Sequence, residues 1–243
     1  MIKLLKALYA VYCLIAFAAS FIIVIPCYFI VFNLFSKKKA PFIAHKVSKF
    51  WAHLLFVLFL VRCKIENKEY IDPDKQYVFV ANHLSMLDIP AYAAACSNSF
   101  RFLSKAELAK VPLLGYVIKN LYITVNRTDR ADRSKSIERM KETIDEGLSV
   151  FLAPEGTRNK TEAPLLDFKD GAFRLAIYAQ VPIAVLTLKN PHHLHSPKRM
   201  LSMRPGVLHG TWSKPIETKG MTEADVPRLK EMVRQQMLSY LQS

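Results

Sequence analysis

Residues 4–35 are almost wholly apolar and form the most hydrophobic stretch of the chain. As one helix these 32 residues would reach about 48 Å, well beyond the ~30 Å hydrocarbon core of a bilayer, and Pro26 is a natural position for a kink or break. A cleaved signal peptide is the competing interpretation. The apolar run continues about fifteen residues past Ser20, which argues against cleavage. We therefore expect a helix that stays in the mature protein and contacts a membrane.

A second apolar stretch covers residues 51–61, and Ile43, Val47 and Phe50 precede it at helical spacing. It is too short to span a bilayer, so it is either a core helix or an amphipathic helix lying in the membrane interface. Lysines flank the first stretch on both sides, whereas a simple span leaves one flank poor in Lys and Arg. We predict that residues 1–64 form a two-helix membrane anchor that dips into one leaflet.

From residue 66 onward, short buried strands alternate with amphipathic helices. The expected strands are residues 77–81, 121–125, 150–152 and 181–188. The expected helices are residues 91–96, 137–148 (with Gly147 placed to end it) and 172–178, and a last helix capped by Thr222 and Asp225, with Leu229, Met232, Val233, Tyr240 and Leu241 as its buried stripe. This alternation predicts an α/β domain over residues 65–243, with a central mostly parallel or mixed sheet flanked by helices.

Charge placement separates membranes from nucleic acids as partners. The 243-residue chain carries a formal net charge of +14, and residues 1–65 hold nine Lys or Arg and no Asp or Glu. The basic part of the chain is thus also its apolar part, which favours anionic lipid headgroups over nucleic acid. The four cysteines (Cys13, Cys27, Cys63 and Cys96) form no CxxC pair, so we expect reduced thiols that fill apolar space.

The first block with candidate chemistry, residues 82–88, directly follows the strand predicted at 77–81. Ligands of open α/β sheets bind at such carboxyl ends of strands. His83 can project from the loop while Asp88 returns from the first turn of the next helix to hold its ring. A carboxylate bonded to one ring nitrogen leaves the other nitrogen free to accept a proton, as a general base requires. The same pair can also merely fasten the loop to the helix, and spacing alone does not separate the two interpretations.

A second block, residues 154–158, follows the strand predicted at 150–152. Gly156 permits a tight turn, and the planar guanidinium of Arg158 suits a phosphate or carboxylate, although an exposed turn with a surface Glu–Arg pair has the same sequence. Arg127 follows the strand predicted at 121–125, and Val181-Pro182-Ile183 opens the last predicted strand. Taken alone, Arg127 indicates a solvated charge, and the run with Pro182 indicates the start of a strand.

Together the blocks resemble the lysophosphatidic acid acyltransferase family (1-acylglycerol-3-phosphate O-acyltransferases). The resemblance rests on Asn82-His83, four residues and Asp88; on Arg127; on the run Pro154 to Arg158; and on Val181 to Ile183, in the family's order and spacing over about residues 65–217. Lys105, Pro112, Gly115, Phe168, Lys169 and Gly171 add to it. The departures are the missing Gly at the opening of the second motif, Ala153 in place of an aromatic, and Ala184-Val185 in place of a second Pro. They leave the reacting groups in place and bear on which acceptor is preferred.

The resemblance implies an enzyme that moves an acyl group from a thioester, acyl-CoA or acyl carrier protein, to the sn-2 hydroxyl of lysophosphatidic acid, giving phosphatidic acid. His83 would be the base and Asp88 its orienting carboxylate. Acceptor binding would fall to Lys105, Arg127, Glu155, Gly156, Thr157 and Arg158. The resemblance implies no metal and no bound cofactor, and the implied location is a membrane, the cytoplasmic face of a bacterial inner membrane.

Two other functions remain open. One is acyl transfer to a different lysolipid, such as a lyso-amino-acid lipid, and the other is a non-catalytic membrane-binding protein. The sequence contains no GxSxG elbow and no GxxxxGK phosphate loop. His192, His193 and His195 lie without Cys or carboxylate neighbours in the sequence, so we interpret them as part of a polar loop, not a metal site.

Overall fold

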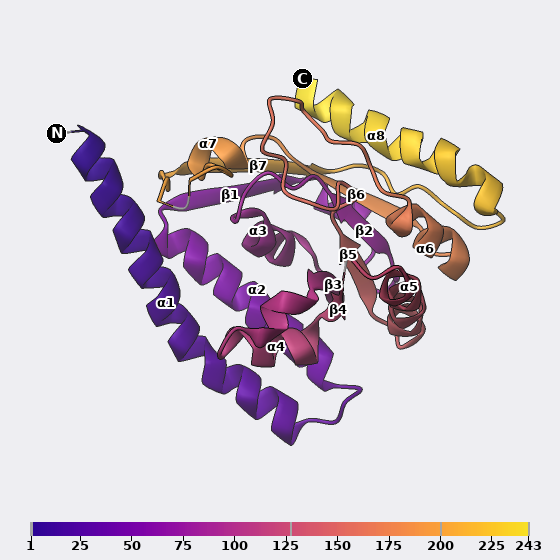
Figure 1. Ribbon diagram of the computed structural model, residues 1–243, viewed down its shortest axis with the longest axis horizontal. Helices are drawn as coiled ribbons and strands as arrows, with labels where there is room; N and C mark the ends of the chain where they lie inside the picture. Colours follow the sequence, from indigo (N-terminus) through magenta and orange to yellow (C-terminus); the bar gives the residue numbers. More distant parts are fainter. Residues whose placement is uncertain (1, 127, 200, 243) are drawn as a thin grey trace.

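The computed structural model describes residues 2–126, 128–199 and 201–242. Two long helices open the chain, α1 (Ile2–Leu34) and α2 (Ala40–Leu58), and they pack against each other in opposite directions (Figure 1). The helix predicted in the first apolar stretch is confirmed, but the chain continues as a helix through Pro26 and does not break there. Val24 and Tyr28, on either side of the proline, are buried in one cluster with Ala44 of α2, and this packing holds both halves in line.

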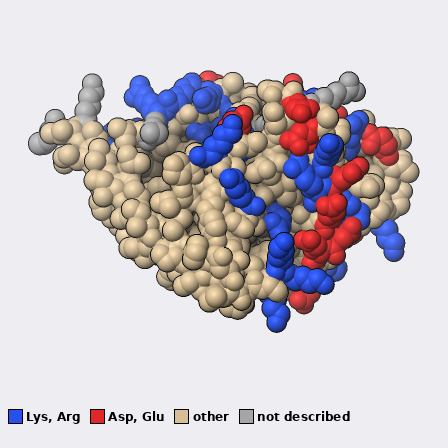
Figure 2. Space-filling model, turned by 60° about the horizontal axis from the view of Figure 1, so that its bottom comes forward, with Lys and Arg blue, Asp and Glu red and all other residues tan. Residues whose placement is uncertain are grey.

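Much of the surface of α1 is apolar. Its exposed hydrophobic side chains include Leu4, Leu5, Leu8, Ile15, Ile22, Ile23, Phe29, Ile30 and Leu34. Figure 2 shows a broad face without charged side chains on this side of the molecule, bordered by Lys and Arg. α1 is also the one helix of the described residues that is long and apolar enough to cross a membrane. Because large exposed apolar patches are rare on soluble monomers, the apolar face of α1 indicates an interaction surface.

The remainder of the chain builds a seven-stranded sheet. Its strands are β1 (Val61–Glu66), β2 (Val78–Ala81), β3 (Phe100–Lys105), β4 (Ile123–Val125), β5 (Ser149–Leu152), β6 (Ile183–Leu188) and β7 (Gly206–Trp212), in the spatial order β1-β7-β6-β2-β5-β3-β4. Every neighbouring pair is parallel except β6 and β7, which are antiparallel. The predicted α/β class with a mostly parallel, mixed sheet is confirmed.

Three strands, β1, β3 and β7, were absent from the sequence prediction. The apolar stretch 51–61 was assigned wholly to a helix, whereas α2 ends at Leu58 and Val61 already belongs to β1. Leu60 turns the chain between them with φ 47°, a conformation that an apolar pattern does not encode. The sheet therefore begins inside the range predicted for the anchor.

Helices cover both faces of the sheet (Figure 1). They are α3 (Asp88–Ala95), α4 (Leu114–Leu121), α5 (Arg130–Asp145), α6 (Gly171–Ala179), α7 (Pro191–Leu194) and α8 (Val226–Gln242), with three short 3-10 turns, η1 (Lys68–Tyr70), η2 (Ala106–Lys110) and η3 (Glu223–Asp225). One core cluster joins α2 and α3 to the sheet, and a second joins α5, α6 and α8 to its other face. α2 packs directly on α3, the helix that begins with Asp88.

The capping box predicted at the start of the last helix is confirmed, since the Thr222 and Asp225 side chains each bond the other's backbone. The buried stripe is only partly as predicted. Leu229 and Val233 are fully buried, but Met232 is 39% exposed, and Met237 takes the inward position instead. Helical spacing fits either methionine, and the packing of α8 on β6 decides between them.

Candidate active site

The sequence motifs meet at the carboxyl ends of four adjacent strands. β2, β5, β3 and β4 lie side by side and parallel. His83, Glu155 and Arg127 follow β2, β5 and β4 in the sequence, and Lys105 is the last residue of β3. Parallel strands bring their carboxyl ends to one edge, where open α/β sheets bind ligands. Arg127 itself lies outside the described residues.

His83 and Asp88 form a hydrogen-bonded pair. Nδ1 of His83 lies 2.8 Å from Oδ2 of Asp88, and the backbone N–H groups of Leu84 and Ser85 donate to the same oxygen over 2.6 and 2.7 Å. The Asp88 side chain is fully buried, while that of His83 is 19% exposed. The buried, triply bonded carboxylate fixes the ring, and Nε2, which bonds to no described residue, is left available for a substrate.

Asn82 fastens this turn to the neighbouring strand. Its Nδ2 donates to the Leu188 carbonyl, and Leu188 N–H donates back to its Oδ1, both over 2.8 Å. The Tyr92 hydroxyl of α3 donates to the Asn82 carbonyl. Asn82 is fully buried, so these bonds are shielded from water. They fix the backbone at the end of β2, from which His83 projects.

Glu155 fastens the two motif loops together. Its Oε1 accepts the His83 N–H and its Oε2 accepts the Leu166 N–H, each over 2.9 Å, and only 2% of the residue is exposed. Asn159 N–H also donates to the His83 carbonyl over 2.7 Å. Burial raises the pKa of the Glu155 carboxyl, and the two N–H donors oppose that rise. Because both oxygens already bond to backbone, the geometry favours a positioning part for Glu155 over contact with an acceptor.

The remainder of the second block turns outward. Gly156 has φ 70°, which glycine adopts without strain, and Thr157 is exposed. Nη2 of Arg158 lies 3.0 Å from the thioether sulfur of Met86, a weak acceptor, and its Nε is buried without a hydrogen-bond partner. Within residues 2–126, 128–199 and 201–242 the Arg158 guanidinium forms no ion pair. It is therefore a cation available to an anionic group beside His83.

Lys105 is the last residue of β3 and is exposed. In the parallel pairing of β3 and β4 it stands opposite Val125, two residues before Arg127. The strand order thus places Lys105 on the same side of His83 as β5 and its Arg158. Both described cations of the predicted set lie at the edge where the His–Asp pair opens.

The histidines near the end of β6 were predicted to be a polar loop, but one of them packs against the site. His195 is 6% exposed, and its Nδ1 lies 3.3 Å from Oγ of Ser85, which in turn accepts the Leu87 N–H. His192, on α7, is exposed at its surface but partly shielded from water, and this partial desolvation, followed by the neighbouring His193, lowers its pKa. Their position just after the strand predicted at 181–188 is the sequence feature that could have indicated a place near the site. No metal-binding cluster occurs among the described residues, and metal-free chemistry stays a prediction.

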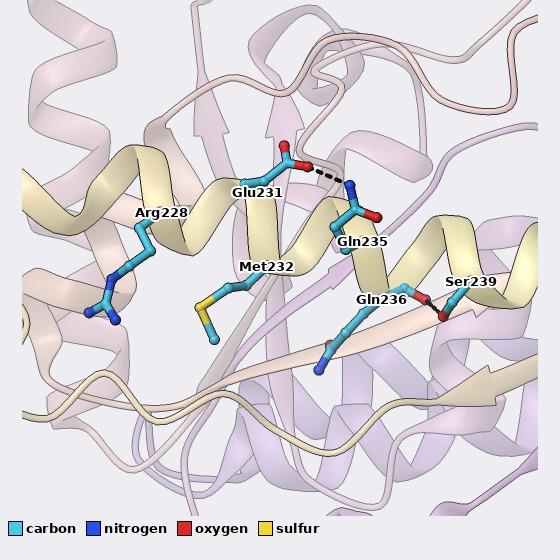
Figure 3. A pocket seen from close by; sticks show the side chains of 6 residues that line it. All are labelled: Arg228, Glu231, Met232, Gln235, Gln236 and Ser239. Carbon is cyan, nitrogen blue, oxygen red and sulfur yellow. Dashed lines mark hydrogen bonds between the residues drawn. The ribbon is translucent and has the colours of Figure 1, made fainter.

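A hollow of about 680 Å³ lies elsewhere, on α8. Its lining consists of Arg228, Glu231, Met232, Gln235, Gln236 and Ser239 (Figure 3). Glu231 and Gln235 bond to each other there, and no motif residue contributes. This helix face provides matched positions for control substitutions.

Comparisons with known proteins agree with the resemblance seen in the motifs. The acyltransferase family model matches residues 62–189. An uncharacterised acyltransferase of Schizosaccharomyces pombe is 35% identical over 68% of this chain and 60% of its own length, and the mouse 1-acyl-sn-glycerol-3-phosphate acyltransferase alpha is 31% identical over 75% and 64%. The chain thus spans less than two thirds of these relatives.

The crystal structure of the 1-acyl-sn-glycerophosphate (LPA) acyltransferase PlsC from Thermotoga maritima has the same fold, with a TM-score of 0.84. The match covers 100% of this chain and 97% of that one at 24% identity. At this level of identity the likeness concerns the fold, and it includes the two N-terminal helices.

Proposed function

Because the chain belongs to the acyltransferase family, we propose that it transfers a fatty acyl group from an acyl thioester to the sn-2 hydroxyl of lysophosphatidic acid, giving phosphatidic acid. The observation that carries the proposal is the hydrogen bond between a fully buried Asp88 and a partly exposed His83. The loop that carries Arg158 contacts His83, since Asn159 N–H donates to the His83 carbonyl, and the Arg158 guanidinium forms no ion pair with any described residue. A base and a cation at one strand edge suit an alcohol substrate that carries a phosphate.

In this proposal Nε2 of His83 accepts the proton as the sn-2 oxygen attacks the thioester carbonyl carbon. The tetrahedral intermediate then collapses, the C–S bond breaks, and the departing thiolate takes the proton from the imidazolium. Asp88 stabilises the charged ring from Nδ1, as a carboxylate does in acid–base pairs of this kind. Such base catalysis contributes roughly 10²–10⁴-fold in rate.

The acceptor phosphate would bind to Arg158 and Lys105, with Arg127 as a third cation. Arg158 can offer two parallel N–H donors to phosphate oxygens, and among the described residues its Nη2 bonds to nothing stronger than the Met86 sulfur. Glu155 would act indirectly, by holding the His83 loop against the turn that carries Gly156, Thr157 and Arg158.

The lipid bilayer is the proposed partner of residues 1–64, and the α/β domain, residues 65–243, would carry the chemistry. The apolar face of α1 and the basic residues that border it suit insertion into an anionic leaflet (Figure 2). The acyl chains can then remain in the membrane while the polar groups react at its surface. The cytoplasmic face of a bacterial inner membrane is the proposed location.

The donor is acyl-CoA or an acyl carrier protein, acting as a substrate with no cofactor. The decisive assay is acyl transfer in detergent, with lysophosphatidic acid and each donor in turn, and products identified by mass. His83→Ala is expected to lose activity by at least about 10²-fold while keeping its circular dichroism and its co-flotation with vesicles. His209→Ala, on β7, is the matched control. Near-normal transfer by His83→Ala would instead support a non-catalytic membrane-binding protein.

A further inference from the structure

We propose that the segment Leu108–Leu113, between β3 and α4, is a third lipid-contacting element, which inserts into an anionic leaflet beside α1 and places the catalytic edge at the membrane surface. This inference rests on the membrane location of the proposed function and adds an insertion point outside residues 1–64.

The segment exposes bulky apolar side chains at close spacing. Leu108 and Val111 are each 42% exposed and Leu113 is 55% exposed. Three such side chains within six residues form a patch, which unlike a single exposed leucine points to an interaction surface. Between residues 105 and 119 the chain has three lysines, Lys105, Lys110 and Lys119, and one acidic residue, Glu107. An apolar tip surrounded by a net positive charge suits an anionic lipid surface.

The backbone holds this tip in a fixed shape. Gly115 crosses so close to Ala109 that a Cβ there would lie 2.3 Å from the Ala109 carbonyl oxygen. Leu113 has φ 62° and ψ −54°, which a side-chain-bearing residue rarely adopts. Bonds from Leu114 N to the Pro112 carbonyl and from Gly115 N to the Val111 carbonyl, both 2.7 Å, maintain the turn. The exposure of Leu113 is therefore a property of a rigid loop.

The segment is continuous with the apolar face of α1. α4, which starts at the next residue, packs on α1 and α2. Asn33 Nδ2 of α1 donates to the Tyr116 hydroxyl over 2.9 Å, and the ring of Phe29 lies 5.8 Å from that of Tyr116. Phe29 is 58% exposed, so the exposed surface of α1 runs up to α4 and its leading loop. Because the segment continues the apolar surface of α1, which we propose to contact lipid, lipid is favoured over a separate protein partner.

The segment is also continuous with the catalytic edge. η2 begins directly after Lys105, at the carboxyl end of β3, which shares its edge with the end of β2 and His83. On the β2 side of this edge, Met86 is 56% exposed and Ile89 is 40% exposed. Apolar side chains near the carboxyl ends of β2 and β3 would contact the leaflet at the place where the acceptor hydroxyl must reach His83.

The test uses the full-length chain and vesicles that contain brominated phosphatidylglycerol, in which bromine quenches nearby tryptophan. Leu113→Trp is compared with Met232→Trp on the outer face of α8, where the parent methionine is 39% exposed. For each variant, the quenching of tryptophan fluorescence is measured, and the quenching of the unsubstituted protein, which contains Trp51 and Trp212, is subtracted. The expected result is strong excess quenching at position 113 and none at position 232.

A protein that floats with the vesicles but shows equal quenching at both positions overturns this inference and leaves the proposed enzyme intact. A protein that does not float overturns both the inference and the membrane location. As a functional readout, Leu113→Asp is expected to raise the KM for vesicle-borne acceptor about tenfold, with kcat unchanged and with the parent's KM in detergent micelles. An unchanged KM on vesicles would contradict the proposal.

Discussion

Nδ1 of His83 and Oδ2 of Asp88 lie 2.8 Å apart, and that one oxygen also receives the N–H groups of Leu84 and Ser85. Replacing Asp88 by Asn keeps an oxygen for the backbone donors but removes the charge that stabilises the imidazolium. We expect Asp88→Asn to fold and to lose about 10²–10⁴-fold in kcat. The measurement is acyl transfer together with thermal unfolding. Asp145→Asn, an exposed carboxylate paired with Lys141, is the control, and equal activity in both variants would refute the pairing mechanism.

Arg158 is the described cation with the clearest opening for an anion, since the Met86 sulfur is a weak partner. Arg158→Met is expected to raise the KM for lysophosphatidic acid about 10- to 100-fold, the loss of charge-assisted hydrogen bonds to a phosphate. A phosphate-free lysolipid should be affected little. Arg228→Met, on the exposed face of α8, is the matched control. If the parent enzyme turns over both acceptors equally, another lysolipid becomes the better assignment.

Glu155 joins two loops through backbone donors on either side of it. In Glu155→Gln an NH₂ group faces one of the two N–H groups, which leaves a buried donor without an acceptor at a cost of about 1–3 kcal/mol. We expect a lower melting temperature and a lower kcat, with the KM for acceptor nearly unchanged. Calorimetry and steady-state kinetics check this. A large rise in KM alone would show that Glu155 contacts the acceptor directly.

Gly115 and Gly171 differ in the space around a hypothetical side chain. A Cβ at Gly115 would overlap the Ala109 carbonyl oxygen, whereas at Gly171, the first residue of α6, it would meet nothing within 4 Å. We expect Gly115→Ala to destabilise the fold by about 1–3 kcal/mol and Gly171→Ala to be neutral or to stabilise it by up to ~1 kcal/mol. Denaturant unfolding measures both. Equal stability of the two variants would contradict the described crossing at Ala109.

Asp225 ends η3 directly before α8, and its carboxylate accepts the Thr222 N–H over 2.9 Å and an Arg228 N–H over 2.8 Å. These bonds, the Thr222 N–H first, lower its pKa. A depressed folded-state pKa adds stability above the unfolded value of about 3.9, and the gain is lost as pH falls through the folded-state pKa. The melting temperature of Asp225→Asn should therefore lie below the parent's at pH 7 and approach it as the pH falls below about 4. A melting-temperature difference between Asp225→Asn and the parent that stays the same from pH 7 to about pH 3 would contradict this account.

The sequence predicted the elements whose signals are local. The runs at 77–81 and 150–152 are continuously apolar because β2 and β5 are covered on both faces, and each precedes a motif. β3 was missed because Arg101 and Lys105 interrupt its pattern next to the edge of the sheet. The contacts of Glu155 could not be foreseen either. Its partner His83 is 72 residues away, and nothing in the residue type separates a backbone clamp from a ligand for substrate.

β1 pairs in parallel with β7, so Val61 pairs with Gly206, which lies 145 residues later in the chain. On a ribosome adding about 5–20 residues per second, the first strand would wait roughly 7–29 s for its partner to emerge. The two long leading helices are complete before that wait begins, and in the proposed membrane location they can insert while β1 is still unpaired. The order of synthesis thus lets the sheet close against two helices that have already formed.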